Sequence, residues 1–578
     1  MNTNRNTLMR HYMYILISVM MVGLFLGSCE QYLEPKEDNL ETQEIAFSSP
    51  ARAEGLLIKA YISLPNQPVF FNEAVVTDNA VTNVDGSQYR QMATGAWKAT
   101  FNPLSQWGGA YNNIFYVNYF LDHINEIEWP DKTSAEEASF KEQRMRGEAF
   151  GLRALYEFKL LKAHAGETEG GDLLGFPIVT EVVEPGEIGD RPRNTFSDCI
   201  AQILADCDSA IAYLPARYED FDNEAKQAAM GEGWKNRMNG DAARALKSMV
   251  TLYAASPAYN ESQANWERAA KVAGTFIASK GGPDISSDGA AFYRNPDSDD
   301  IIWRTTAHPG ATSLDWEQMN FPPSLEGNGE VNPTQDLVSS FPMKSGYPID
   351  HSNSQYDSDN PYADRDDRLS EYVLYNGAPF KDTAIYTHTQ APTDGINQGE
   401  FSTRSGFYLK KFMMPGVSLQ APQAQKIHFR TFFRMTEVYL NYAEAAFEAW
   451  GWDADPQGYG FTAKDIITSI REEHGGITQP DQYVETISGE ENIRQLIHNE
   501  RRLELCFEGH RFWDIRRWAD TETMKDAVEG VFATAVTDST FTYETRQIES
   551  RAYEDYMIYG PVPYNDVLNF DLEQNKGW

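Results

Sequence analysis

Cysteine is scarce in this sequence, with only four among 578 residues. Cys199 and Cys207 are eight residues apart on an expected helix, which separates them by about 12 Å along its axis, too far for a disulfide bond. Cys506 has no neighbouring cysteine, and no cysteine spacing is typical of a zinc site. We therefore expect neither a disulfide framework nor a zinc centre.

Catalytic motifs are missing as well. The sequence has no HExxH motif, no GxSxG elbow and no Walker A loop, and its ten histidines are scattered. The acidic stretch 357–368 offers oxygen ligands for calcium, but it lacks the central glycine and the terminal glutamate of an EF-hand loop, so a solvated loop is the simpler interpretation. The sequence thus predicts a protein that is not an enzyme, with no metal and no cofactor.

Positive charge is in short supply. Lysine and arginine number 49 against 85 aspartates and glutamates, which gives a formal net charge of −36. A surface of this sign repels phosphate groups, so nucleic acid is disfavoured as a partner and a polyanionic ligand is disfavoured more mildly. The acidity also suits a protein that must stay soluble outside the cytoplasm.

Long apolar runs are confined to the N-terminus. Arg5 and Arg10 precede the uncharged stretch 12–26, which is shorter than the roughly 20 apolar residues that span a bilayer. A basic start followed by a short apolar core is typical of a secretory signal. The stretch ends in Leu-Gly-Ser-Cys at 26–29, which resembles the lipobox of bacterial lipoproteins.

This N-terminus predicts a lipid-anchored protein. The lipobox implies that residues 1–28 are removed as a signal peptide and that Cys29 is acylated, and the polar residues 29–45 are then a tether to the folded part. Several acyl chains, each contributing about 0.8 kcal/mol per buried methylene, make such an anchor stable. The alternative is an uncleaved helix with a chance cysteine.

Helical periodicity dominates the rest of the chain, in two blocks at about 46–280 and 430–520. Small residues recur where a partner helix would approach, a pattern similar to tetratricopeptide helices but without a clean 34-residue period. The stretch 281–430 is rich in Pro, Gly, Asn and Asp and predicts a loop-rich layer, and the last sixty residues also look largely irregular. We expect helices at 106–127, 140–163, 195–214, 240–255, 266–279, 433–450, 463–473 and 490–507.

Several segments together resemble one family. The stretch 496–518, LIHNERRLELCFEGHRFWDIRRW, resembles the C-terminal signature of the SusD/RagB family, the nutrient-binding outer-membrane lipoproteins of Bacteroidetes. Further segments agree with the family in the same order, at 147–154, 175–179, 193–195, 332–338, 433–445, 561–563 and 574–578.

The resemblance implies a mainly α fold: one domain over 46–578, with a tetratricopeptide-like helical scaffold and a large irregular ligand-binding layer. It also implies a lipoprotein at the cell surface of the outer membrane, which captures oligosaccharides or polysaccharide and delivers them to a SusC-like TonB-dependent transporter. The alternative, suggested by RagB-like members, is a peptide-binding or purely structural lid of such a transporter.

One carboxylate stands out on the helix expected at 490–507. Glu500 lies in the middle of the apolar face, and burial of a carboxylate is costly unless it is paired. We expect it to pair with an arginine, for which Arg434, Arg511 and Arg516 are the candidates. A catalytic acid is the alternative, but no motif places a second carboxylate opposite it.

Sugar binding calls for flat aromatic rings against the C–H face of a pyranose and polar groups around its rim. Aromatic residues in loop-like sequence outside the family motifs are the candidates for ligand binding: Trp97, Tyr293 and Trp316. Starch-binding relatives carry an aromatic arc in corresponding regions. Hydrogen bonds to the rim are expected from Tyr89, Arg90 and Asp78. The alternative is that these rings are core residues, with Trp97 packed on the 106–127 helix.

Overall fold

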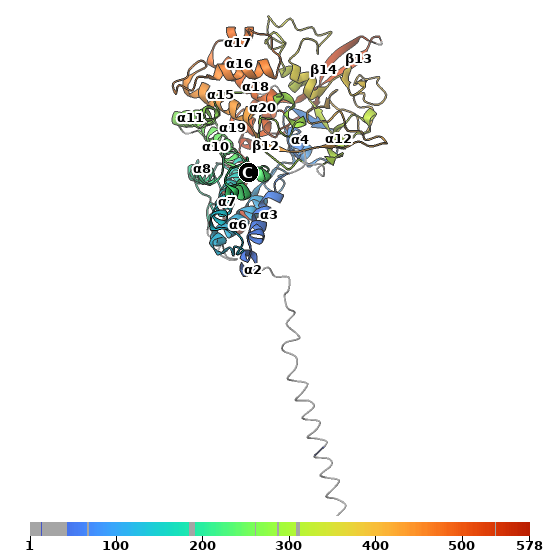
Figure 1. Cartoon of the computed structure of the whole chain (residues 1–578). Coiled ribbons are helices and arrows are strands. Elements are labelled where there is room, and N and C mark those ends of the chain that lie inside the picture. The colour runs from blue at the N-terminus through green and yellow to red at the C-terminus, as the bar shows by residue number, and fades with distance from the viewer. Residues whose placement is uncertain are drawn as a thin grey trace, which may run out of the picture.

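The computed structural model describes residue 13 and residues 43–578, apart from 66–68, 184–190, 261, 286–287, 308–311 and 538. The expected signal peptide and Cys29 lie outside the described residues, apart from Met13, and stay predictions. Figure 1 shows a narrow helical lobe below a broader upper lobe, with the described chain beginning at the lower end in α2 (Gln43–Phe47). None of the described helices has the length and apolar character of a membrane span.

Long helices packed side by side form the scaffold. In chain order, α6 packs on α7, α7 on α8, α8 on α10, α10 on α11, α11 on α15 and α15 on α16. The mainly α fold is therefore confirmed. The principal helices are α3 (Pro50–Ile62), α6 (Trp107–His123), α7 (Ala135–His164), α8 (Phe196–Tyr213), α10 (Gly240–Ala255), α11 (Gln263–Ser279), α15 (Met435–Trp450), α16 (Ala463–Glu473) and α18 (Glu490–Glu504).

Local capping explains why several helix bounds follow from the sequence. Asn239 accepts a hydrogen bond from the backbone N–H of Ala242 at the start of α10, and Thr462 and Asp465 form a reciprocal capping box at the start of α16. Both helices have the expected bounds. Helix α18 ends three residues before the expected end, at Glu504, because Phe507 has a positive φ of 62° that no helix continues through.

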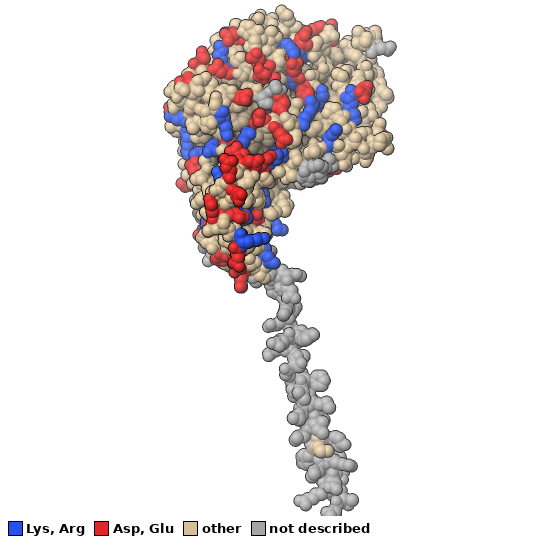
Figure 2. Space-filling view, viewed as in Figure 1, with Lys and Arg blue, Asp and Glu red and all other residues tan. Residues whose placement is uncertain are grey.

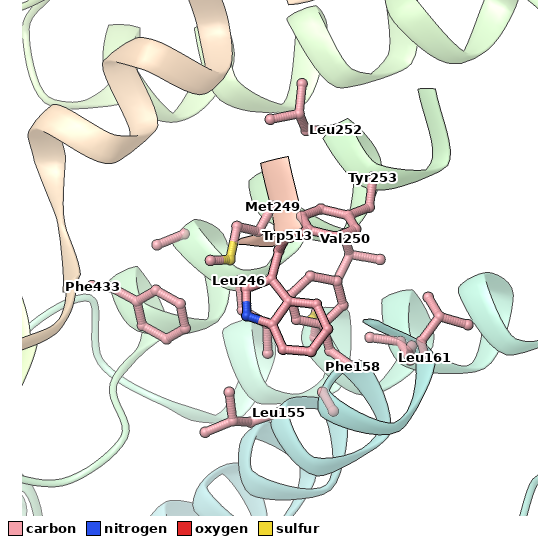
Figure 3. Close-up of a cluster of buried hydrophobic side chains, with 14 of the residues drawn as sticks. Leu155, Phe158, Leu161, Leu246, Met249, Val250, Leu252, Tyr253, Phe433 and Trp513 are labelled. Atoms are coloured by element: carbon pink, nitrogen blue, oxygen red, sulfur yellow. The ribbon is translucent and has the colours of Figure 1, made fainter. Parts of the chain in front are cut away.

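The scaffold core is one large apolar cluster. Figure 3 shows its centre, where α7 meets α10 and the side chains of Phe433 and Trp513 lie among those of the two helices. Helix α7 is buried on nearly every side of its second half, as the sequence predicts. The labelled contributors are Leu155, Phe158 and Leu161 from α7 and Leu246, Met249, Val250, Leu252 and Tyr253 from α10.

The loop-rich layer has an apolar core of its own, built around Tyr372, Phe407 and Phe412. Short antiparallel pairs of strands frame it: β1 (Ala80–Thr82) with β6 (Val331–Pro333), β7 (Val373–Leu374) with β10 (Tyr408–Leu409), β8 (Ala378–Phe380) with β9 (Thr383–Ile385), and β12 (Thr431–Arg434) with β4 (Ile301–Arg304). The layer is thus irregular yet packed. That residues 46–578 form a single domain stays a prediction.

The C-terminal region is more regular than expected. Strands β13 (Val528–Ala535) and β14 (Phe541–Glu549) pair as a long antiparallel hairpin, and α21 (Tyr564–Phe570) follows. The expectation of a largely irregular end is therefore wrong over 528–549. Aromatic and β-branched residues are frequent in both strands, and residues of this kind favour a pleated, half-buried surface.

Short elements complete the described chain. They are α4 (Val69–Ala74), α5 (Gln88–Gln91), α9 (Glu224–Met230), α12 (Asp315–Asn320), α13 (Gln335–Ser340), α14 (Asp367–Tyr372), α17 (Gln482–Thr486), α19 (Arg511–Arg517), α20 (Thr521–Lys525), β2 (Gly166–Glu167), β3 (Leu173–Leu174), β5 (Thr312–Ser313) and β11 (Lys426–Ile427).

Candidate functional site

The three aromatic residues expected to bind a ligand are all buried. Trp97 is 3% exposed and lies in the scaffold core, where its ring centroid is 4.8 Å from that of the C-terminal Trp578. The rings of Phe512 and Tyr553 complete its surroundings at 5.8 and 6.0 Å. Trp97 therefore packs the fold together.

Tyr293 and Trp316 lie in the other core, that of the loop-rich layer, and are 2% and 4% exposed. Their rings approach the same side chain, Phe412, at centroid distances of 4.9 and 6.1 Å. The Tyr293 hydroxyl donates a hydrogen bond to Glu371 over 2.6 Å. The expectation that the three rings form an exposed platform is wrong. Tyr293 and Trp316 lie in the core of the loop-rich layer, and Trp97 lies in the scaffold core.

The polar residues expected beside that platform are engaged in ion pairs. The Asp78 carboxylate is 2.8 Å from the guanidinium groups of both Arg502 and Arg511, and these arginines hold its pKa well below its usual range although burial opposes them. Arg90 pairs with Glu549 and Asp85 at 2.8 and 2.9 Å.

Tyr89, the remaining residue of that set, packs partly buried against the scaffold core. The contacts of all three polar residues are structural, and a role for them in ligand binding stays a prediction.

Glu500 is fully buried and ion-paired, as expected. Its partners differ from the expected ones, since Oε1 lies 2.5 Å from Nη1 of Arg368 and Oε2 lies 3.5 Å from Nη1 of Arg471. The three arginines named from the sequence contact other groups. Arg434 pairs with Asp300, Glu504 and Glu508, Arg511 pairs with Asp78, and Arg516 donates to the carbonyl of Ile558.

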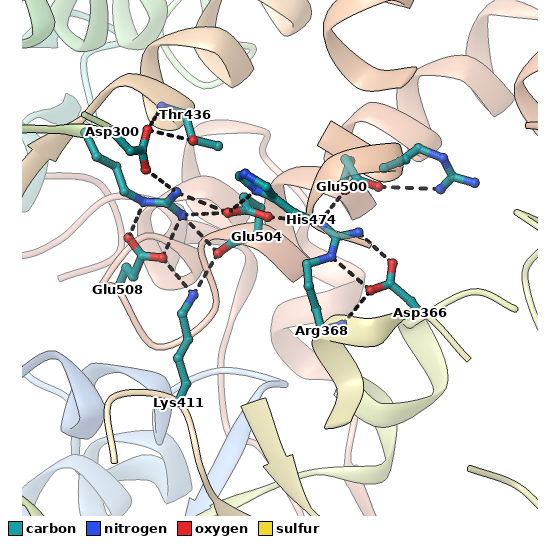
Figure 4. A network of polar contacts seen from close by, with 11 residues as sticks. Asp300, Asp366, Arg368, Lys411, Thr436, His474, Glu500, Glu504 and Glu508 are labelled. Atoms are coloured by element: carbon teal, nitrogen blue, oxygen red, sulfur yellow. Dashed lines mark hydrogen bonds and ion pairs between the residues drawn. The ribbon is translucent and has the colours of Figure 1, made fainter. Parts of the chain in front are cut away.

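Figure 4 shows that Glu500 belongs to a wider buried network of charges. Lys411 pairs with Glu508 at 2.7 Å, and His474 lies 3.1 Å from Glu504. Although burial opposes them, the positive charges of His474 and Arg434 hold the pKa of Glu504 well below its usual range. Each carboxylate of this network has a cationic partner. We therefore interpret the network as structural, linking the scaffold to the loop-rich layer.

A cavity of about 700 Å³ lies directly beside this network. It opens between the segment 339–352, the short helix α17 and one face of α18. Its lining mixes aromatic, amide, hydroxyl and acidic side chains: Ser339, Ser340, Pro342, Gly346, Pro348, Ile349, Asp350, His351, Ser352, Arg471, Tyr483, Gln495, Leu496 and Asn499. We call it the α18 cavity.

Aromatic rings form one wall of the α18 cavity. The rings of Tyr347 and His351 stack at 4.6 Å with an interplanar angle of 21°, and the ring of Tyr483 approaches them at 5.7 and 5.8 Å. Tyr483 and His351 are partly exposed, whereas Tyr347 supports them from within. Burial raises the pKa of Tyr483, so its hydroxyl stays protonated and able to donate a hydrogen bond.

Polar groups also line the α18 cavity. The amide nitrogen of Asn499 donates to the carbonyl of Ser340 at 2.9 Å, and that of Gln495 donates to Glu491 at 3.0 Å. Each amide nitrogen is thereby engaged, which leaves the amide oxygen as the group able to accept a hydrogen bond from a ligand. The carboxylate of Asp350 is exposed at the rim. Amide and carboxylate acceptors thus line the same cavity as the aromatic rings.

The floor of the α18 cavity is anchored to the charge network. Arg471 donates from Nη2 to the carbonyl of Gly346 at 2.7 Å and pairs through Nε with Asp481 at 2.6 Å. Gly346 has a φ of +91°, and a Cβ there would collide with the Asp481 carboxylate. The shape of the floor is therefore set by the same residues that hold Glu500.

Sequence reasoning missed this cavity although three of its lining residues, Gln495, Leu496 and Asn499, lie in or next to the family signature at 496–518. Gln495 and Asn499 lie outside the apolar stripe of α18, which a helical projection could have singled out, whereas the buried Leu496 belongs to that stripe. No local pattern places the segment 339–352 opposite them.

A second, more exposed group of rings lies near the β13–β14 hairpin. Tyr386 is 43% exposed, and its ring centroid is 6.0 Å from that of His388 and 6.5 Å from that of Phe541. These three rings form a ledge without an enclosing wall. It is the alternative place for a ligand to stack.

Among the residues that the structure describes, no group of three or more His, Cys, Asp and Glu side chains is placed to hold a metal ion. The three cysteines in that part of the chain are buried and free.

Comparison with protein families gives two matches. Residues 299–578 match the model of the SusD family, and residues 31–232 match a model described as "starch-binding associating with outer membrane". No protein of curated function matches the chain.

Solved structures with the same fold include a SusD-like protein from Bacteroides fragilis, at 23% identity and a TM-score of 0.71, covering 92% of this chain and 98% of that one. A SusD-like carbohydrate-binding protein from the same species has 22% identity and a TM-score of 0.71, with 90% and 98% covered. Surface glycan-binding protein A from Bacteroides fluxus has 17% identity and a TM-score of 0.60, with 92% and 100% covered. Identities this low show a common fold.

Proposed function

Because this chain belongs to the SusD/RagB family, we propose that it is a non-catalytic lipoprotein of the outer-membrane surface that binds glycans. In this proposal it captures oligosaccharides or polysaccharide and delivers them to a TonB-dependent transporter. The family model matching its N-terminal part is described as starch-binding and associating with the outer membrane, which supports both the ligand class and the location.

The α18 cavity is the observation that carries the ligand class. Its aromatic wall of Tyr483 and His351 offers flat surface for the C–H face of a pyranose. The amides of Gln495 and Asn499 and the carboxylate of Asp350 offer hydrogen bonds for the hydroxyl rim. A volume of about 700 Å³ is within the range of small-molecule sites.

The experiment that tests this function is a glycan array probed with the purified protein, together with pull-down on insoluble polysaccharides. Retention of one class of glycan is the expected result. Retention of peptides and of no glycan would favour the alternative, a peptide-binding lid of the transporter. Retention of neither glycans nor peptides would favour a purely structural lid.

Delivery to a transporter follows from what the protein has to do after capture. A lipid-anchored binder without a catalytic motif has no means of moving or cleaving its ligand, so a partner barrel is needed. We expect a stable complex with a TonB-dependent barrel, whose outer mouth this chain covers. Co-purification from native membranes in several mild detergents tests this, and repeated recovery of the protein without a barrel would contradict it.

A further inference from the structure

The α18 cavity carries at its rim a carboxylate that no protein group neutralises. Asp350 lines the cavity, and its side chain is exposed. Within the part of the chain that the structure describes, this carboxylate makes neither an ion pair nor a hydrogen bond. Lys344, the nearest lysine in the sequence, pairs with Asp367 instead, at 2.7 Å. A ligand that brings a positive charge into the cavity would therefore meet an unpaired negative charge.

The guanidinium group in the lining of the cavity has no charge to spare. Arg471 pairs with Asp481 and Glu500 at 2.6 and 3.5 Å. Arg368, the next cation of the network, pairs with the same Glu500 and with Asp366. The two arginines are thus matched by three buried carboxylates. The floor of the cavity therefore offers no positive charge that would offset Asp350.

The aromatic wall adds no positive charge either. Nδ1 of His351 accepts a hydrogen bond from the backbone N–H of Asn353 at 3.1 Å, so the ring is neutral, with its proton on Nε2. Burial raises the pKa of Tyr483, and the charges of Asp350 and Asp481 act in the same direction, against that of Arg471. The Asp350 carboxylate thus acts on the ring of Tyr483. Aromatic faces attract cations, so the rings and the carboxylate favour the same kind of ligand group.

Two amide oxygens extend this preference along α18. Gln495 and Asn499 are one turn apart, so their side chains lie on the same face of the helix. Their nitrogens are engaged, and their oxygens can accept hydrogen bonds from a ligand. An ammonium group has three N–H donors and no acceptor, whereas a carboxylate has only acceptors. The cavity is therefore complementary to an ammonium group and repels a carboxylate.

The charge of the whole chain acts in the same direction. The formal net charge is −36, and Figure 2 shows acidic side chains on both lobes. A field of this sign raises the concentration of cations near the surface and lowers that of anions. A sugar with a carboxylate is thus disfavoured by the surface as well as by the rim of the cavity.

We propose that the α18 cavity selects glycans that contain a sugar with a free amino group. The ammonium group binds Asp350, and the pyranose ring lies against Tyr483 and His351. This inference rests on the proposed glycan binding and names the class of sugar. The paired amide oxygens of α18 favour a sugar over a lysine-containing peptide, because hydroxyl groups flank the amine of a sugar. Acetylation of the amine removes its charge, so the acetylated sugar should bind less tightly.

Calorimetric titration of the full-length protein in detergent tests the proposal at about pH 6, where an amine of ordinary pKa is protonated. The probes are a glucosamine disaccharide, its N-acetylated form and a glucose disaccharide of the same linkage. We expect the glucosamine probe to bind about tenfold more tightly than the other two, the effect of one charged hydrogen bond. Added salt should reduce this preference. Asp350→Asn should abolish it, and Asp350→Glu should retain it because the charge is kept.

Asp382→Asn is the matched control, since Asp382 is an exposed aspartate between β8 and β9 and does not line the cavity. It should leave the preference unchanged. Equal or weaker binding of the glucosamine probe would overturn the proposal, as would a preference that survives Asp350→Asn. If the array still retains a glycan in that case, the proposed function stands and only the amino-sugar preference fails.

A lysine-containing peptide is the last probe. Tighter binding of this peptide than of the glucosamine probe would overturn the proposal and favour the peptide-binding alternative. Weaker binding of the peptide is the expected result, because the amide oxygens of Gln495 and Asn499 would then lack hydroxyl donors. Melting curves of each variant separate lost binding from lost folding.

Discussion

Arg368 donates a hydrogen bond from Nη1 to Oε1 of Glu500 at 2.5 Å, across 132 residues of chain, and both side chains are fully buried. Arg368 lies on α14 in the loop-rich layer, and Glu500 lies on α18 of the helical scaffold. Their pairing therefore ties together two parts of the molecule that have separate apolar cores.

Removing the Glu500 carboxylate should destabilise the protein strongly. Glu500→Ala leaves Arg368 and Arg471 buried with less negative charge around them, and we expect a loss of about 3–5 kcal/mol in the free energy of unfolding. Urea denaturation measures it. Glu490→Ala, at the exposed start of the same helix, is the control, and an equal loss in both variants would contradict the role of the buried pair.

Trp97, Tyr293 and Trp316 should behave as core residues. Because each ring is buried, replacement by alanine should lower the free energy of unfolding by about 3–5 kcal/mol and leave the glycan affinity of the folded protein unchanged. Denaturation and calorimetry on the same samples test this. The exposed Tyr564→Ala variant should change stability by less than about 0.5 kcal/mol. Lost affinity in well-folded Trp97, Tyr293 or Trp316 variants would restore these rings to the binding site.

Acid should destabilise the protein in part through His164. Its Nε2 accepts from the backbone N–H of Gln106 at 3.1 Å, and its Nδ1–H donates to the carbonyl of Pro561 at 2.7 Å, so the neutral ring is the one that fits. Burial lowers the pKa of His164 to about 4, with the charges of Arg193 and Arg516 adding to the effect. The unfolded chain then binds the extra proton, and stability falls as the pH drops from about 6.5 toward 4.

The size of the acid effect can be isolated with a variant. Between pH 7 and pH 5, His164 should account for a loss of about 2 kcal/mol in the free energy of unfolding. The glutamine of His164→Gln does not titrate. Over this interval the free energy of unfolding of the variant should therefore fall by about 2 kcal/mol less than that of the unchanged protein. An identical pH dependence in the two proteins would mean that folding does not lower the pKa of His164.

The lipid anchor is a prediction from the sequence alone. Cys29→Ala should abolish incorporation of radiolabelled palmitate and release the protein from membranes, because the acylated thiol is removed. Palmitate labelling followed by membrane fractionation tests it. Unchanged labelling of the Cys29→Ala protein would show that the lipobox is not used.

The sequence is most informative where structure is decided locally. Capping residues such as Asn239 and Thr462 mark the starts of α10 and α16, and the glycine after α15 marks its end, so these bounds are predictable. The burial of Glu500 is also predictable, because it follows from the apolar face of a single helix.

Long-range relationships are another matter. Arg368 is 132 residues from Glu500, and the arginines nearer to Glu500 in the chain were equally plausible partners. Trp97 and Trp316 lie in segments whose composition is typical of loops. The rings of an irregular segment can point into the core as readily as toward solvent. The α18 cavity requires 339–352 to meet α18, and only the folded structure shows that meeting.

The most direct test of glycan capture in the α18 cavity is the dissociation constant of the glycan retained on the array, measured by calorimetry for the unchanged protein and for Tyr483→Ala. The structure predicts a loss of about 1–3 kcal/mol in binding free energy, the range of an aromatic hot spot, with an unchanged melting temperature and no effect of Tyr564→Ala. Unchanged affinity of Tyr483→Ala, together with weakened binding by Tyr386→Ala, would contradict this account and move the site to the ledge beside the β13–β14 hairpin.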